Sequence, residues 1–177
     1  MSNKCIVYTR LGGDVAIYYP APACLSTMSS GGWWDQFPLE TVRQQVARQV
    51  QRGIPRWAAM RYFEAMGDGG LDEHDALLVL RDRDCSYLGT GHEVWPHTEI
   101  PKDRWFRDAW RRSHNGGPIY IEMRKARSIH WGRLVHAAKK VEIQLGRWRD
   151  RIRRAETPDE LRLLWPRGLI PHHVAIG

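Results

Sequence analysis

The sequence predicts an α+β fold that combines a small antiparallel or mixed sheet, a helical middle and one long basic amphipathic helix. Short runs rich in Ile, Val and Tyr flank a Gly-Gly turn near the N-terminus, a pattern typical of a β-hairpin. Apolar residues then recur at helical spacing between residues 38 and 84. At 177 residues and 42% hydrophobic content, the chain is long enough for one sizeable core. We therefore expect a single domain spanning residues 1–177.

The predicted hairpin occupies residues 1–22, with strands at 5–10 and 15–19 and two glycines in the turn, where positive φ values are needed. Residues 20–36 have no regular period and are predicted to form a loop. The Ser-Ser-Gly-Gly sequence of this loop lacks the following Lys-Ser/Thr pair of a P-loop. We therefore expect a plain linker here.

Three short helices joined by glycine turns are predicted for residues 38–84, the first beginning at Pro38 and the third at an Asp72 cap. Such an arrangement invites a helix-turn-helix interpretation. The third helix, however, would present a series of carboxylates to DNA phosphates, and like charges repel. These carboxylates are Asp72, Glu73, Asp75, Asp82 and Asp84. A small helical packing unit is the preferred interpretation.

Residues 102–154 are predicted to form a basic helix-strand-helix segment, after a strand at 92–97. Its first helix begins at residue 102 or 103, and its strand, at 118–123, is expected to join the N-terminal hairpin in one sheet. A Thr-Pro-Asp-Glu cap then predicts a short helix at 157–165, and residues 166–177 are expected to form a tail.

The long helix of this segment carries apolar residues whose spacing alternates between three and four, which defines a heptad seam. The seam consists of Trp131, Leu134, Ala138, Val141, Leu145, Trp148 and Ile152. It lies either against the rest of the chain or against a second copy. In the second case we expect a homodimer through Trp131, Leu134, Val141, Leu145, Trp148 and Ile152.

Positive charge is concentrated in residues 102–154, which hold sixteen Lys or Arg and five Asp or Glu, whereas the rest of the chain holds eleven and fifteen. Arginine binds phosphate bidentately, and interleaved Trp can stack on bases. The candidate nucleic-acid-binding residues are Arg104, Arg107, Arg111, Arg133, Lys140, Arg147 and Arg154. The expected partner is nucleic acid or an acidic protein surface. The alternatives are a solvated helix face and a protein-interaction module that uses the seam or exposed Trp.

No group of residues in the sequence specifies a reaction, so we expect a binding protein rather than an enzyme, without catalytic, metal or cofactor sites. Cys85, His92, Glu93 and His97 are suitable zinc ligands, but their spacing matches no compact site. Neighbouring aspartates should raise the pKa of Cys85 and suppress its thiolate. The three dispersed cysteines fit free thiols in a reducing cytoplasm, and neither a signal peptide nor an apolar membrane span is visible.

Three short sequences lie within residues 102–154: Asp-Arg-Trp-Phe-Arg-Asp-Ala-Trp at 103–110, Asn-Gly-Gly at 115–117 and Lys-Ala-Arg-Ser-Ile-His at 125–130. Together they resemble a recurring pattern in uncharacterised phage and prophage proteins. The resemblance extends to both ends, through residues 6–22 and 157–166. It implies a mobile genetic element in a bacterial host cell or a phage particle, and it implies no catalytic or binding residues.

Overall fold

The chain forms two compact units in the computed structural model, which describes residues 3–36, 39–102, 104–139, 145–167 and 169. The first unit comprises Met1–Pro101 and Arg112–Pro118, and the second comprises Lys102–Arg111 and Ile119–Gly177. Helices predominate and the sheets are small and antiparallel, which confirms the predicted α+β class.

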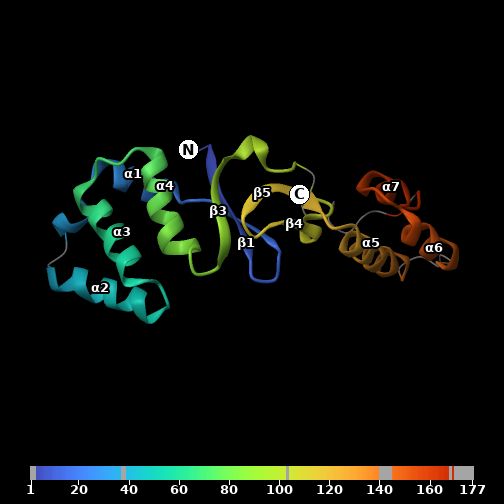
Figure 1. The fold of residues 1–177 in the computed structure, drawn as a ribbon, viewed down its shortest axis with the longest axis horizontal. Coiled ribbons are helices and arrows are strands. Elements are labelled where there is room, and N and C mark those ends of the chain that lie inside the picture. The colour runs from blue at the N-terminus through green and yellow to red at the C-terminus, as the bar shows by residue number, and fades with distance from the viewer. Residues whose placement is uncertain (1–2, 37–38, 103, 140–144, 168, 170–177) are drawn as a thin grey trace. The chain divides into compact units, whose positions relative to one another are not determined.

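The first unit is built on a three-stranded antiparallel sheet with strand order β2-β1-β3, in which Figure 1 labels β1 and β3. The strands are β1 (Lys4–Arg10), β2 (Val15–Tyr18) and β3 (Gly89–Pro96). Both the N-terminal hairpin and the strand predicted at 92–97 are therefore confirmed. In the central strand, the five consecutive residues Cys5 to Thr9 are all buried, so both faces of β1 are covered.

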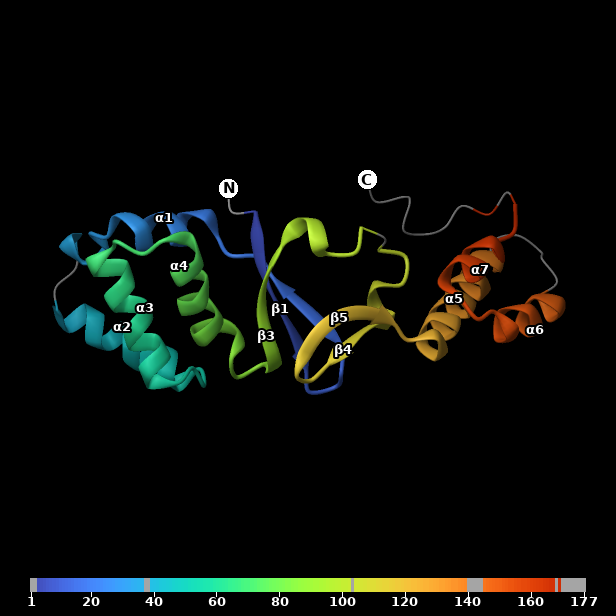
Figure 2. The ribbon, with the colours of Figure 1, turned by 45° about the horizontal axis from the view of Figure 1, so that its top comes forward.

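Four α-helices of the first unit gather on one side of this sheet (Figure 2). They are α1 (Pro22–Ser30), α2 (Leu39–Gln51), α3 (Arg56–Asp68) and α4 (Glu73–Leu80), and a π-helical turn, Arg81–Cys85, follows α4. Shorter 3-10 turns lie at Trp33–Gln36 and His97–Glu99. The helices predicted within residues 38–84 are confirmed, although Pro38 itself lies outside the described residues. The Asp72 cap is also found, since its carboxylate accepts the backbone N–H of Asp75 at 2.9 Å.

The prediction of a loop at 20–36 is wrong for α1. Pro22 stands at the start of this helix, where its missing N–H costs nothing, and Met28 is fully buried in the core. The same core receives Ile6 and Tyr8 from β1 and Leu77 from α4. Because α1 contains few apolar residues, no helical period is visible in its sequence. Packing of Met28 in the core supports its helical conformation.

The strand predicted at 118–123 exists as β5 (Gly116–Ile121), but its pairing was predicted incorrectly. It pairs with β4 (Trp110–Ser113) in a separate two-stranded sheet rather than with the N-terminal hairpin. The helix predicted to begin at 102 or 103 is also wrong, since the described residues show only a 3-10 turn, Arg107–Ala109, before β4. Gly116 and Gly117 have φ values of 96° and 98°, which allow the tight reversal between the strands.

The second unit contains α5 (Met123–Ala138), α6 (Gly146–Arg154) and α7 (Pro158–Leu163). The prediction of a single long basic helix is therefore wrong, because the described residues of this segment form two helices, α5 and α6. Residues 140–144, which include Lys140 and Val141, lie outside the described residues, as does most of the predicted tail. The short C-terminal helix is confirmed, with the Thr157 hydroxyl accepting the N–H of Glu160 at 3.2 Å.

The described residues of the heptad seam pack within the second unit. Leu134 is fully buried and Ile152 is 3% exposed, and Trp131, Leu145 and Trp148 pack against the same core. The two helices therefore bury this surface against each other and against their own unit. The homodimer predicted through these residues gains no support, because Leu134 and Ile152 are not accessible to a second copy.

Candidate nucleic-acid interface

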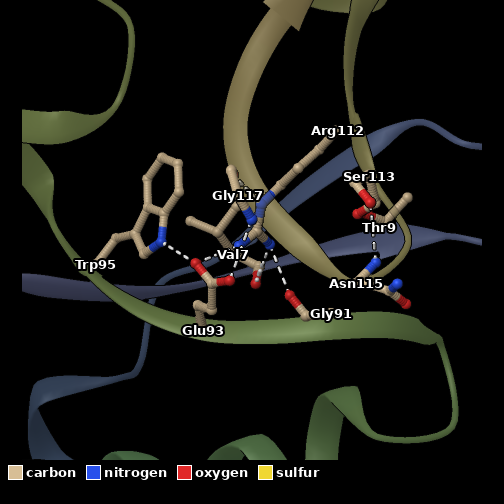
Figure 3. A network of polar contacts seen from close by, with 9 residues as sticks. All are labelled: Val7, Thr9, Gly91, Glu93, Trp95, Arg112, Ser113, Asn115 and Gly117. Atoms are coloured by element: carbon tan, nitrogen blue, oxygen red, sulfur yellow. Dashed lines mark hydrogen bonds and ion pairs between the residues drawn. The ribbon is translucent and has the colours of Figure 1, made fainter.

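Arg112 lies at the centre of a polar network in the first unit (Figure 3). Its side chain is fully buried and forms an ion pair with Glu93. Its Nε donates to the Gly117 carbonyl at 2.6 Å, and its Nη1 donates to the carbonyls of Gly91 and Val7 at 2.6 and 3.1 Å. This guanidinium thereby joins the first residues of β5 to strands β1 and β3.

The Glu93 carboxylate also has several partners besides Arg112. It accepts the indole N–H of Trp95 at 2.7 Å and the backbone N–H of Gly117 at 3.2 Å. Burial alone would raise the pKa of Glu93, but these donors and Arg112 stabilise the carboxylate and lower the pKa below its ordinary value. The charges of the network are thus satisfied within the unit, and we interpret it as structural.

Gly91 shows how closely the turn after β4 approaches β3. The register of β1 and β3 slips between Val7 and Thr9, and Gly91 adopts a φ of 62° at this bulge. A Cβ atom at Gly91 would lie 2.7 Å from the Gly116 nitrogen and 2.7 Å from the His114 oxygen. Only glycine fits both the conformation and the space.

A second group of arginines, in the second unit, lines an open depression of about 290 Å³ between α5 and α6. We call it the arginine pocket. Arg124, Arg127, Ser128 and Trp131 of α5 and Arg149, Ile152 and Arg153 of α6 line it. Within each helix these residues are spaced by three or four positions or are neighbours, so they share one helical face. The packing of α5 on α6 brings the two faces together.

The charges of the arginine pocket have few internal partners. Arg127 Nε donates to the Ala155 carbonyl at 2.9 Å. Within the described part of the chain, no carboxylate lies within ion-pair distance of Arg124, Arg149 or Arg153. Four arginines line one small depression, so positive charge is concentrated there and the arrangement favours an anionic ligand.

The predicted binding residues do not form one stripe. Arg133 turns inward, donates to the Trp105 carbonyl and lies over the Trp105 ring. Arg111 pairs with Glu122 at 3.0 Å, and its side chain is only 13% exposed. The remaining predicted residues are Arg104, Arg107, Arg147 and Arg154, which are exposed, and Lys140, which lies outside the described residues. The predicted stripe required one continuous helix. Because α5 ends at Ala138, the stripe does not continue from Arg133 to Arg147 and Arg154.

The residues Arg124, Arg127, Arg149 and Arg153 were not recognised as a group from the sequence. Their spacing was visible, since Arg124 and Arg127 are three residues apart and Arg149 and Arg153 are four apart. Their convergence depends on the break between α5 and α6, which a continuous heptad pattern conceals.

The first unit also contains an apolar groove of about 890 Å³ between α2 and α3. Its apolar lining includes Val46 and Phe63, and charged residues such as Arg43 and Glu64 also line it. No side chain of α2 whose burial is described is buried, although α2 packs along α3. The groove is therefore an open surface on this unit, unlike the seam between α5 and α6.

The residues considered as zinc ligands do not converge. A ring nitrogen of His92 lies 2.8 Å from the backbone oxygen of Cys85, and Glu93 is held by Arg112. Across the described ranges, no three His, Cys, Asp or Glu side chains are grouped as metal ligands. Burial, followed by Asp84, raises the pKa of Cys85 to about 12, in the direction expected from the sequence.

Comparison of the chain with protein-family models, with curated proteins and with solved structures found no match. Among the described helices, none has both the length and the apolar character needed to cross a bilayer.

Proposed function

We propose that this protein binds nucleic acid through the phosphate backbone at the arginine pocket of α5 and α6. The observation that carries the proposal is that Arg124, Arg127, Arg149 and Arg153 line one depression and that, among the described residues, none of the four has a carboxylate partner. Phosphate is the anion that guanidinium groups bind bidentately.

The composition of the pocket favours a nucleic acid over an acidic peptide. Trp131 provides an aromatic wall beside the arginines, and aromatic faces bind bases by stacking. Carboxylates of a peptide would satisfy the charges but would leave the aromatic face without a matching group. The surrounding segment, with sixteen Lys or Arg against five Asp or Glu, would attract a polyanion over a longer range.

The biological setting that we propose is an accessory protein of a phage or prophage, as the resemblance in sequence implies. The protein-interaction alternative loses the heptad seam, whose described residues pack within the second unit. In the described part of the first unit, that alternative keeps the exposed Trp33 and Trp57 and the apolar groove between α2 and α3.

Fluorescence anisotropy with labelled oligonucleotides in low salt tests the proposal. We expect the double variant Arg149→Gln/Arg153→Gln to bind at least about tenfold more weakly than the unmodified protein, because removing each guanidinium–phosphate pair costs about 1 kcal/mol or more. The matched control is Arg147→Gln/Arg154→Gln, which removes the same charge from the same helix outside the pocket lining.

The control should weaken binding by less than about threefold. Equal weakening in the two variants would show that binding depends on general charge and not on the pocket. No binding by the unmodified protein in low salt would reject the proposed function, and the groove between α2 and α3 would then become the candidate surface.

A further inference from the structure

The packing of α5 on α6 places several arginines beside one depression and does not align them in a row along one helix. A straight helix with a cation every seven residues would place them about 10 Å apart, a spacing suited to successive phosphates of a duplex. In the structure, α5 and α6 are separate helices whose arginines face one pocket of about 290 Å³. An open depression of this size has room for about one nucleotide and does not extend along several phosphates of a double helix.

Trp131 lines the same pocket as the four arginines and is only partly buried. The faces of a base within a duplex are covered by the neighbouring base pairs, whereas an unpaired base can place its face against an indole. Ser128, an exposed residue one turn before Trp131, adds a hydroxyl that can bond to phosphate or sugar oxygens.

Arg127 is already oriented before any ligand binds. Its Nε donates to the Ala155 carbonyl, which occupies one of its five N–H groups and leaves four for a ligand. A guanidinium fixed in this way loses little conformational entropy when it contacts phosphate. The residues that line the pocket thus include an arginine held by a backbone carbonyl and an aromatic side chain.

We infer that the arginine pocket receives an unpaired nucleotide, with its phosphate among the arginines and its base against Trp131, so that the preferred ligand is single-stranded nucleic acid. This inference rests on the proposed function and specifies the class of its ligand.

Three ligands of equal length test it by anisotropy at one salt concentration: an oligodeoxythymidine strand, the same strand with abasic sites throughout, and a duplex. The abasic strand keeps the phosphates and removes the bases. We expect it to bind about fivefold or more weakly than oligodeoxythymidine, the lower end of what stacking of one base contributes. The duplex, despite its higher charge density, should also bind more weakly than oligodeoxythymidine.

Substitution of Trp131 identifies the stacking surface. Trp131→Leu should lower oligodeoxythymidine affinity to the level of the abasic strand, whereas Trp131→Phe should retain most of the difference. Trp57→Leu is the matched control, because Trp57 is 56% exposed on α3 and lies outside the pocket. Circular dichroism checks that each variant folds, and the comparison of ligands on the unmodified protein requires no variant.

The outcomes separate this inference from the proposed function. Equal affinity for the normal and abasic strands, or tighter binding of the duplex, would overturn the unpaired-nucleotide site and leave backbone binding in place. Failure of all three ligands to bind would instead reject the proposed function itself.

Discussion

Arg112 and the arginines of the pocket are the same residue type in opposite circumstances. Arg112 is fully buried and meets three backbone carbonyls and one carboxylate. Arg149 and Arg153 lie on the surface of α6 and meet no carboxylate among the described residues. A buried charge is retained only when its hydrogen bonds are satisfied, whereas a cluster of unsatisfied surface charges reduces stability unless a ligand neutralises it.

The largest expected effect concerns Arg112. Arg112→Met should lower the free energy of unfolding by about 3 kcal/mol or more, because it leaves the carbonyls of Val7, Gly91 and Gly117 without a donor and Glu93 without its cation. Urea denaturation measures the change, and Arg149→Met, which should alter stability by less than about 0.5 kcal/mol, is the control. Similar values for the two variants would contradict the contrast between the buried and the surface arginines.

The next effect concerns the close approach at Gly91. Gly91→Ala should cost about 2 kcal/mol or more, because its φ is positive and the new methyl group would collide with the turn after β4. Gly70→Ala is a matched control, since Gly70 also has a positive φ but has nothing within 4 Å of a Cβ atom. The difference in the free energy of unfolding between the two variants measures the cost of the collision, since both variants share the strain of a positive φ. Equal destabilisation of the two variants would contradict the collision.

A smaller effect on stability is expected when His130 is protonated. This residue is fully buried in the second unit against the rings of Trp105 and Trp165. Burial lowers the pKa of His130, with Arg133 acting in the same direction and the Leu164 carbonyl opposing both. The unfolded chain therefore binds this proton more readily, so stability should fall as the pH drops below about 6.5.

Urea denaturation between about pH 8 and pH 5 measures this dependence, and His130→Phe should reduce its slope across that range. Glu93, whose pKa is also lowered, should contribute only at lower pH, as the pH falls below the ordinary range of a carboxyl group. An unchanged slope in His130→Phe would show that other groups cause the decrease in stability.

The smallest expected effect is a gain in stability. Arg149→Gln/Arg153→Gln should raise the free energy of unfolding by a few tenths of a kcal/mol in low salt, because it relieves repulsion around the pocket. The gain should disappear at about 1 M salt, where charges are screened within about 3 Å. Thermal melting at two salt concentrations measures it. A decrease in stability in low salt would mean that these arginines serve the fold.

Local signals in the sequence were sufficient for the elements whose conformation is determined locally. The Gly turn of the first hairpin, the Asp72 cap and the Thr157 cap are found as predicted, because capping and turn residues act over a few positions. The pairing of β5 depends on contacts between distant residues, which periodicity does not encode, and the heptad pattern gave no sign that α6 begins at Gly146. The segment that carries the candidate site was thus identified from charge, and its pocket residues were not.

The salt dependence of binding tests the central claim most directly. The slope of log K against log salt should be shallower by about 1 to 2 for Arg149→Gln/Arg153→Gln than for the unmodified protein, since each phosphate contact contributes about 0.7 on a single strand and 0.9 on a duplex. The slope of Arg147→Gln/Arg154→Gln should stay within about 0.5 of the unmodified value. Identical slopes for the unmodified protein and the pocket variant would contradict the claim that the pocket arginines contact phosphates.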